Sequence, residues 1–279
     1  MVYFIFTVDG DWKEYFNIHL SEKKRLPQLQ TVQTLIEQEI KVAQRLLEGK
    51  FLHFIHTSSR ARTFFIQKSF LALWKYIIQN SGDIGLHCHE DDPHKAYYIQ
   101  DIARMRKVIS EQVNILRSYG LNIQAYRGGN LAFCKGLIPI LEENGIRFDF
   151  SCEPGRYFVD ADSVVSDWRA APTSLYRMSH LDHRREGNSK VYEVPIGTSQ
   201  GHFLYFEKSS LQEISKVAHN LGGHSSQGSC DIIVSVLTHT YEYDSQDAIK
   251  IIGEKISLLK EYGRFINLKE LEEIVEIAP

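Results

Sequence analysis

The chain has 279 residues, of which 43% are hydrophobic, and it carries a formal charge of −3. This content can bury the core of one large α/β domain, so we expect a single domain over residues 1–279. Acidic and basic residues are interspersed, which argues against a nucleic-acid-binding surface, and no apolar run reaches the ~20 residues that a membrane-spanning helix needs.

The compartment and the partners are predicted from the same features. The amino terminus lacks the basic region, apolar core and cleavage site of a secretory signal, so we expect a cytoplasmic protein. We expect a small-molecule or glycan substrate and neither nucleic-acid nor membrane partners, while the oligomeric state stays open. The cysteines have no short paired spacing, which argues against a thiolate zinc site and a disulfide framework: Cys88, Cys134, Cys152 and Cys230.

Strands and helices are predicted to alternate along most of the chain. Residues 1–8 form a β-branched and aromatic run that ends in Asp-Gly-Asp, as a buried strand does where it meets a loop. Residues 29–48 keep a helical spacing of apolar side chains, and Gly49 follows at the position of a C-terminal cap. Further strands are predicted at 51–56, 84–89, 123–126, 147–151, 191–194 and 231–237. Further helices are predicted at 64–79, 102–119, 136–144, 210–221, 245–262 and 268–277, the last with Asn267 and Glu270 as a capping box.

Residues 152–190 break this alternation. They are rich in charge, Ser and Pro, and we interpret them as an irregular excursion within the domain and not as a linker between domains. The rest of the pattern predicts a mostly parallel sheet of about seven strands covered by helices, either closed as a barrel or doubly wound.

Polar side chains at the carboxyl ends of the predicted strands favour the barrel. In a barrel these ends meet at one mouth, whereas an open sheet would spread them apart, and the chain has no Gly-rich phosphate loop. We therefore expect an α/β fold of the distorted TIM-like (β/α) barrel type. The side chains in question are Asp9 and Asp11, His87 and His89, Arg127, Asp149, and His239.

Two short segments carry residues that suit metal chemistry. Asp9 and Asp11 place two carboxylates where a strand becomes a loop, so that one can hold a metal while the other stays free as a base; Asp-Gly is also ordinary turn chemistry. His87 and His89 stand at i and i+2 of a strand, so both imidazoles point to one face. Zinc accepts two nitrogens and an oxygen as ligands and keeps a position open for water. The alternative is that the two histidines are exposed or hydrogen-bonded elsewhere, because such a pair has the same sequence pattern.

Two single residues end strands further along the chain. Arg127 directly follows a strand and precedes Gly128 and Gly129, which let the backbone approach a ligand closely; a surface arginine beside a glycine turn is the alternative. His239 ends the most apolar strand, where its imidazole faces either the barrel mouth or a hydrogen bond in the core.

With these segments in order, the chain resembles the polysaccharide deacetylase family, which is carbohydrate esterase family 4 of the NodB-homology type. The resemblance spans nearly the full length and implies a distorted barrel with one catalytic divalent metal. The segments that look like the five family motifs are Phe6–Asp11, Ile84–His89, Tyr126–Gly129, Ser166–Arg169 and Leu237–His239, with Phe148–Ser151 and Glu193–Pro195 as accompanying landmarks.

The resemblance also implies a role for each residue. One divalent ion, Zn²⁺ or another first-row metal, is expected on Asp11, His87 and His89. Asp9 is expected to be the catalytic base and His239 the general acid. Arg127 and Asp167 are expected to hold these two groups in place and tune them.

Three departures from the family pattern concern these same motifs. The family more often spaces its two histidines four residues apart, which here would pair His87 with Asp91, so the third ligand stays open between His89 and residues such as Asp91 and His94. A proline usually stands where Gly128 or Gly129 stands. The two aspartates of the first motif are usually adjacent and not separated by Gly10.

These observations predict a metal-dependent hydrolase that acts on a carbon–nitrogen bond other than a peptide bond. It would remove an acyl group, an acetyl group in the first instance, from the amide of an amino sugar or a related glycan intermediate. Two alternatives remain. One is the allantoinase-like hydrolysis of a small cyclic amide or ureide, and the other is a carbohydrate-binding barrel without catalytic activity.

Overall fold

The computed structural model describes residues 1–17, 19–58, 61–92, 96–160, 163–227 and 231–277. Within them, every one of the seven predicted strands is present and joins one sheet. These strands are β1 (Val2–Asp9), β2 (Leu52–His56), β3 (Asp83–Cys88), β6 (Ala125–Gly128), β7 (Phe148–Asp149), β11 (Tyr192–Glu193) and β14 (Ile232–His239).

The sheet has the order β10-β11-β7-β6-β3-β2-β1-β14 and is almost entirely parallel. β10 (Tyr176–Arg177) is antiparallel to β11, and the short β15 (Arg264–Phe265) pairs with the start of β1, whose end pairs with β2. The extended chain after β11 then reaches β14, since Ile196 forms a parallel bridge with Ser235. The sheet therefore curls toward closure, which confirms the prediction of a distorted (β/α) barrel.

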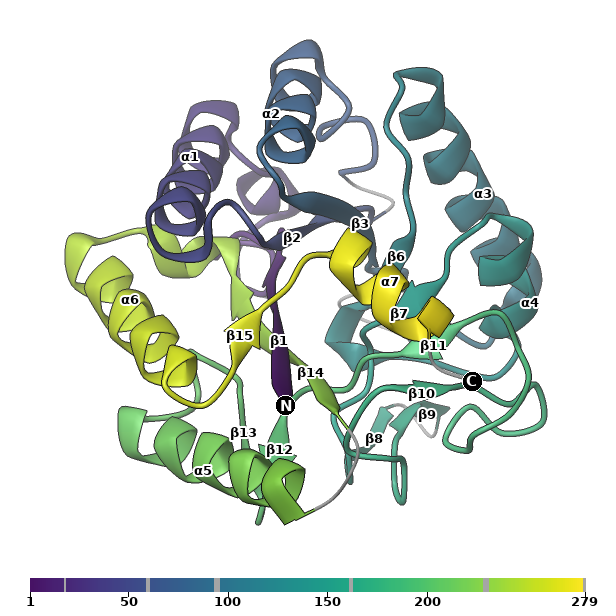
Figure 1. The fold of residues 1–279 in the computed structure, drawn as a ribbon. Coiled ribbons are helices and arrows are strands. Elements are labelled where there is room, and N and C mark those ends of the chain that lie inside the picture. Colours follow the sequence, from purple (N-terminus) through teal and green to yellow (C-terminus); the bar gives the residue numbers. More distant parts are fainter. Residues whose placement is uncertain (18, 59–60, 93–95, 161–162, 228–230, 278–279) are drawn as a thin grey trace.

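Helices surround the sheet (Figure 1). They are α1 (Leu29–Leu47), α2 (Lys68–Gln79), α3 (Ile102–Ser118), α4 (Leu137–Glu143), α5 (Leu211–Gln227), α6 (Gln246–Lys260) and α7 (Leu268–Ile277). The prediction that α2 begins at residue 64 was wrong. Gln67 is extended, and the preceding turn instead packs the Phe65 ring on Phe70, while the Phe65 carbonyl accepts a hydrogen bond from the Trp74 indole.

Side-chain alternation along β1 explains how an apolar strand delivers a carboxylate to the barrel mouth. Phe4 and Phe6 pack against the helices outside the sheet, whereas Ile5 belongs to the core inside the barrel. Because successive side chains of a strand point to opposite faces, Thr7 and Asp9 face inward with Ile5.

The amino ends of the strands are covered by α7. Its residues Leu268 and Leu271 belong to the inner apolar core with Phe54 and Phe148. The predicted capping box is confirmed, because the Asn267 and Glu270 side chains accept hydrogen bonds from each other's backbone N–H groups. With this end filled by apolar packing, a site can form only at the carboxyl ends.

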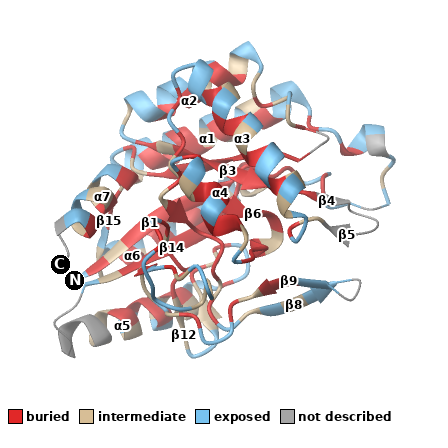
Figure 2. Cartoon of the chain, turned by 90° about the vertical axis from the view of Figure 1, so that its right-hand side faces the viewer, coloured by how far each residue is buried: buried red, intermediate tan, exposed pale blue. Residues whose placement is uncertain are grey.

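In the described part of the chain, three two-stranded sheets lie outside the main sheet. The excursion at 152–190 contains β8 (Tyr157–Asp160) and β9 (Ser163–Asp167), which Figure 2 shows as a hairpin apart from the barrel strands. The other two pair β4 (Asp91–Asp92) with β5 (Ala96–Tyr97), and β12 (Thr198–Ser199) with β13 (His202–Phe203).

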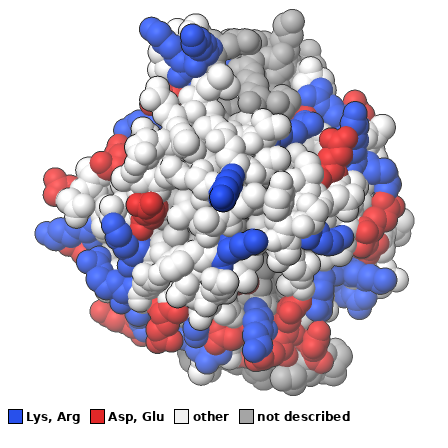
Figure 3. All heavy atoms as spheres, turned by 90° about the horizontal axis from the view of Figure 1, so that it is seen from above, with Lys and Arg blue, Asp and Glu red and all other residues white. Residues whose placement is uncertain are grey.

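The surface over α1 and α2 carries few charges. Figure 3 shows, on the face that lies uppermost in Figure 1, a largely uncharged centre with isolated basic side chains and mixed charges along the edges. Among the described residues, no helix combines the length and apolar character needed to cross a membrane. The described cysteines Cys88, Cys134 and Cys152 are buried and free, and Cys230 lies outside the described residues.

The contact between β3 and α7 makes stability depend on pH. Burial raises the pKa of the Asp83 carboxyl, which accepts a hydrogen bond from the Leu268 N–H, to about 7. Because this pKa is above its unfolded value of 3.8, the carboxyl reduces stability as pH rises from about 4 to about 7. Asp83→Asn keeps the hydrogen-bond acceptor but cannot ionise. We therefore expect its free energy of unfolding to rise relative to that of the wild type as pH rises through this window, by at most ~4 kcal/mol. Urea denaturation at pH 5 and pH 8 measures this difference in free energy of unfolding, with the exposed Asp160→Asn as control. An equal difference at both pH values would contradict the prediction.

Candidate metal centre

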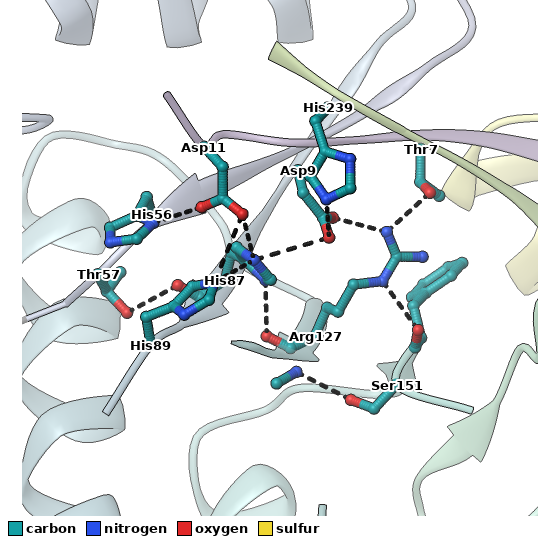
Figure 4. A network of polar contacts seen from close by, with 12 residues as sticks. Thr7, Asp9, Asp11, His56, Thr57, His87, His89, Arg127, Ser151 and His239 are labelled. Atoms are coloured by element: carbon teal, nitrogen blue, oxygen red, sulfur yellow. Dashed lines mark hydrogen bonds and ion pairs between the residues drawn. The ribbon is translucent and has the colours of Figure 1, made fainter. Parts of the chain in front are cut away.

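The pairing register of the parallel strands brings the predicted site residues to one level of the barrel. Asp9 pairs with His239 on β14, while His87 pairs with His56 on β2 and with Arg127 on β6. Figure 4 shows the side chains of these residues pointing toward one another from their separate strands. The tertiary structure therefore gathers residues that lie up to 230 positions apart, which a shared barrel mouth requires.

Three of these side chains form a compact set of donor atoms. Asp11 Oδ2 lies 3.4 Å from His87 Nε2 and 3.5 Å from His89 Nε2, and the two Nε2 atoms lie 2.9 Å apart. Ligands held ~2.1 Å from one tetrahedral ion lie ~3.4 Å from each other, so the two spacings from Asp11 match a shared ion, while the two Nε2 atoms lie somewhat closer together. One carboxylate oxygen and two imidazole nitrogens are the donor set expected of a zinc or related first-row metal site that keeps room for water.

Neighbouring groups orient both imidazoles. The backbone carbonyl of Arg127 lies 3.3 Å from His87 Nδ1, so this nitrogen donates the hydrogen bond and Nε2 stays free to bind a metal. The His89 ring lies against Gly129, where a Cβ would come within 2.5 Å of Nδ1. A glycine is therefore required at position 129 for His89 to reach the site, which accounts for one departure from the family pattern.

The glycine between the two aspartates has a similar cause. Gly10 donates its N–H to the Phe54 carbonyl at 2.9 Å, and a Cβ at this position would lie 2.6 Å from the same oxygen. The close approach of β2 therefore requires a glycine here, and the carboxylates of Asp9 and Asp11 are carried on either side of it.

His56 is a member of the site that the sequence analysis did not single out. Its Nδ1 donates to Asp11 Oδ1 at 2.7 Å, and its ring stacks on His89 with centroids 4.8 Å apart. Asp11, His56 and His89 can also be grouped as possible ligands of one ion. Since His56 Nδ1 already binds the Asp11 oxygen that faces away from His87, we assign His56 to orienting the carboxylate. The sequence feature that could have identified His56 is its position at the end of the predicted strand 51–56.

The electrostatics keep Asp11 ionised and His56 neutral. Burial alone would raise the pKa of Asp11, but the nearby His89 and His87 imidazoles outweigh it and hold that pKa well below its usual range. Burial also lowers the pKa of His56 to about 4, against the opposing effect of its hydrogen bond to Asp11. An ionised carboxylate at Asp11 is the protonation state in which that residue can bind a metal ion.

Asp9 lies beside this donor set and is bound by Arg127. The Arg127 guanidinium is fully buried and donates to Asp9 Oδ1 at 2.6 Å, to Thr7 Oγ1 at 2.9 Å and to the Phe150 carbonyl at 2.8 Å. Burial alone would raise the pKa of Asp9, but Arg127, with His87 and His239, lowers it. The second oxygen, Oδ2, faces the site 3.6 Å from His87 Nε2, where it can accept a proton.

His239 faces Asp9 across the pocket. Its Nε2 lies 4.0 Å from Asp9 Oδ2, and its Nδ1 lies 3.4 Å from Glu207 and 3.5 Å from Glu242. Burial alone would lower the pKa of His239, but the two glutamates raise it to about 10, so the imidazole is protonated at neutral pH. Tyr241 stacks on this ring at 4.8 Å and donates to Glu207 at 2.6 Å.

The structure does not bring Asp167 to His239. The Asp167 carboxylate is bound by Arg169 and Arg184 at 2.8–2.9 Å, and Asp167 does not line the pocket. The expectation that Asp167 tunes the general acid is therefore corrected, because β9 belongs to a hairpin that turns this carboxylate toward its own two arginines. Glu207 and Glu242 are the acidic neighbours of His239 instead.

The loop after β3 is fixed by its own ion pairs. Glu90 is buried and binds both Arg62 and Arg104, the latter at 2.8 Å. This cluster holds the chain next to His89. Of the other two candidate ligands, His94 lies outside the described residues, and so does the side chain of Asp91.

A small cavity opens onto the donor set. It has a volume of about 170 Å³ and is bounded by the following side chains: Asp9, Asp11, Phe16, His87, His89, Asn130, Leu131, Arg156, Tyr205, Lys208, Leu237, His239 and Tyr241. The predicted metal ligands, base and general acid therefore share one solvent-accessible cavity. This size suits a small acyl group with part of a sugar ring better than a large apolar ligand.

Comparisons with solved structures define the class of fold. A "putative polysaccharide deacetylase" from Mycobacterium smegmatis matches with a TM-score of 0.63 and 12% identity, over 99% of this chain and 90% of that one. A "probable Polysaccharide deacetylase" from Pseudomonas aeruginosa PAO1 matches with a TM-score of 0.57 and 11% identity, over 96% and 89%. Puue allantoinase matches with a TM-score of 0.57 and 12% identity, over 95% and 87%.

The chain therefore has the NodB-type polysaccharide deacetylase fold. No protein-family model matches the sequence, and no curated protein matches it significantly. Because a fold can host several activities, and an allantoinase shares this one, the function has to be argued from the site.

The role of His56 can be tested by metal binding. We expect His56→Ala to weaken Zn²⁺ binding ~10–100-fold, because the Asp11 carboxylate loses its orienting donor. We expect His89→Ala to abolish high-affinity binding, because a ligand is lost. Isothermal titration of chelator-treated protein measures both, with the exposed His219→Ala as control. If His56→Ala lost as much Zn²⁺ affinity as His89→Ala, His56 would instead be a metal ligand.

The role of Glu207 can be tested by the pH dependence of turnover. Its carboxylate raises the pKa of His239, so Glu207→Gln lowers that pKa and shifts the alkaline limb of the kcat profile to lower pH. The shift is measured as kcat from pH 6 to pH 11, with Glu254→Gln on the outer surface of α6 as control. An alkaline limb at the wild-type pH would contradict the effect of Glu207 on the pKa of His239.

Proposed function

We propose that the protein is a metal-dependent hydrolase that removes an acyl group, an acetyl group in the first instance, from the amide nitrogen of an amino sugar or related glycan intermediate. One observation carries this proposal. The three predicted metal ligands, the buried and ionised carboxylate of Asp9 and the protonated imidazole of His239 all lie on one cavity. The NodB-type fold, which this chain shares with structures described as polysaccharide deacetylases, supports it further.

Asp11, His87 and His89 would hold the divalent ion. When bound there, such an ion supplies Lewis acidity, which polarises an amide carbonyl and makes water a stronger acid. The identity of the ion is part of the proposal, and Zn²⁺ is our first choice because two imidazoles and one carboxylate suit it.

Asp9 would act as the general base. Arg127 fixes one of its oxygens at 2.6 Å, so the other oxygen is directed at the cavity and can accept the proton of the attacking water. Because the same arginine holds the pKa of Asp9 low, the carboxylate is ready to accept a proton throughout the neutral range.

His239 would act as the general acid. Its Nε2 faces the cavity, while Glu207 and Glu242 lie beside Nδ1 and keep the ring protonated. The proton on Nε2 can therefore pass to the amine as the carbon–nitrogen bond breaks. Asp9 Oδ2 and His239 Nε2 lie 4.0 Å apart on the same cavity, so one amide group can be reached by both, with the attacking water beside Asp9 and the leaving nitrogen beside His239.

A ureide or small cyclic amide is a second candidate substrate. Two observations favour keeping it: the cavity is small, and a solved structure with this fold is an allantoinase. The same base, acid and metal ligands would serve that reaction, since it also breaks a carbon–nitrogen bond beside a carbonyl.

The test uses protein reconstituted with Zn²⁺ and measures acetate release from N-acetylglucosamine and its short oligomers, with allantoin in parallel. We expect Asp9→Asn and His239→Ala each to lower kcat ~10²–10⁴-fold, because each removes one proton-transfer group. Both should bind Zn²⁺ nearly as the wild type does, and Asp160→Asn and His219→Ala are the matched controls.

Each outcome has a definite meaning. Unchanged hydrolysis by either variant would remove that residue from the mechanism. Turnover of allantoin alone would favour the ureide reaction. Protein that binds no divalent metal in the titration would contradict the enzyme proposal and favour a binding barrel.

A further inference from the structure

Two cations line the cavity without a role in the proposed chemistry. Lys208 follows the extended segment that bridges to β14, and Arg156 precedes β8 in the excursion at 152–190. They come from different loops, and both line the same cavity as Asp9 and His239. Two basic side chains beside a metal site are electrostatically unfavourable, because their positive charges repel each other and a bound divalent cation. Their presence therefore needs an explanation.

Lys208 is held over the cavity by an aromatic contact. Its ammonium lies 4.2 Å from the centroid of the Tyr205 ring, and Tyr205 Oη lies 3.5 Å from His239 Nε2. One tyrosine ring therefore separates this ammonium from the proposed general acid. Among the described residues, no carboxylate lies within ion-pair distance of Lys208, so its charge is available to a ligand.

Arg156 is positioned but only weakly bound. Its Nε donates to Ser166 Oγ at 3.1 Å, and its other hydrogen bonds, to Glu153 and to the Asn130 carbonyl, are 3.5 and 3.4 Å long. The guanidinium also lies 5.4 Å from the centroid of the Phe158 ring. Charge-assisted hydrogen bonds of arginine are normally ~2.7–2.9 Å long, as those of Arg169 and Arg184 to Asp167 are. A ligand anion can therefore take over part of this guanidinium at little cost.

The charged groups deeper in the site have partners other than these two cations. A divalent ion would offset Asp9 and Asp11, while Glu207 and Glu242 both lie beside His239. Arg127 faces the buried Asp149 and Glu193, where burial raises the pKa of both carboxyls so that the pair carries fewer than two charges. Lys208 therefore has no carboxylate partner among the described residues, and Arg156 has Glu153 as its ion-pair partner at 3.5 Å.

We infer that the substrate carries an anionic group, a phosphate or a carboxylate, on the same sugar as the scissile amide, and that Lys208 and Arg156 bind it. This inference rests on the proposed deacylase function and narrows its substrate class to acidic N-acyl amino sugars. Both residues act on substrate binding and not on proton transfer, so their loss should appear in KM and not in kcat.

The experiment compares three substrates with Zn²⁺-loaded protein: N-acetylglucosamine 6-phosphate, N-acetylmuramic acid and neutral N-acetylglucosamine. We expect at least one anionic substrate to exceed the neutral one ~10-fold in kcat/KM, and this preference to shrink as salt is raised. The phosphate and carboxylate arms show which anion the site takes.

Variants then test the two side chains. We expect Lys208→Gln and Arg156→Gln each to raise KM for the preferred anionic substrate roughly fivefold, with kcat and the neutral substrate little changed. Lys208→Arg should keep the preference for the anionic substrate. Arg156→Lys preserves the positive charge and so controls for loosening of the β8–β9 hairpin in Arg156→Gln. Lys13→Gln, at a lysine paired with Asp244 outside this cavity, is the matched control.

A binding measurement separates this inference from the proposed reaction. Calorimetric titration of Zn²⁺-loaded protein with glucosamine 6-phosphate and with glucosamine should show tighter binding of the phosphate, and Lys208→Gln should remove the difference. If no N-acyl sugar is hydrolysed but this difference is found, the proposed reaction fails and the anion site stands. Equal turnover and equal binding of neutral and anionic compounds, or a preference that both Gln variants retain, would overturn the inference.

Discussion

The burial of two carboxylates side by side at the end of β1 is the constraint on which the rest of the site depends. Asp9 and Asp11 are almost fully excluded from solvent, so each would be costly to ionise without a compensating partner. Arg127 compensates Asp9, and the imidazoles of His56, His87 and His89 surround Asp11. These partners come from β2, β3 and β6, so the sheet must curl for the charges to be satisfied.

A polar layer below the candidate site connects it to the apolar floor of the barrel. Arg127 spans this layer, since it binds Asp9 above and the Phe150 carbonyl of the next strand beside it. Ser151 accepts from the Gly128 N–H and donates to Asp149, which ties the turn after β6 to β7. The landmarks at Phe148–Ser151 and Glu193–Pro195 thus have a physical role, because they supply the buried groups that face the Arg127 guanidinium.

The departures from the family motifs are linked to one another in space. A histidine two residues after His87 reaches Asp11 only if its ring can lie on residue 129, and that residue is a glycine. Gly10 likewise allows β2 to approach closely enough for His56 to bind Asp11. The altered spacings therefore describe one rearranged site, in which the excursion at 152–190 contributes Arg156 to the cavity and keeps Asp167 away from it.

By itself, the sequence determined the strands, the helices and the residues that end each strand, because side-chain periodicity and turn chemistry act over a few neighbouring positions. Asp9, Asp11, His87, His89, Arg127 and His239 could be named on that basis. Only the tertiary structure decided which side chains meet across strands. His56 binds a carboxylate 45 positions away, and Glu207, 32 positions before His239, takes the place expected of Asp167. Such pairings depend on strand order, register and the path of the loops, which no local pattern encodes.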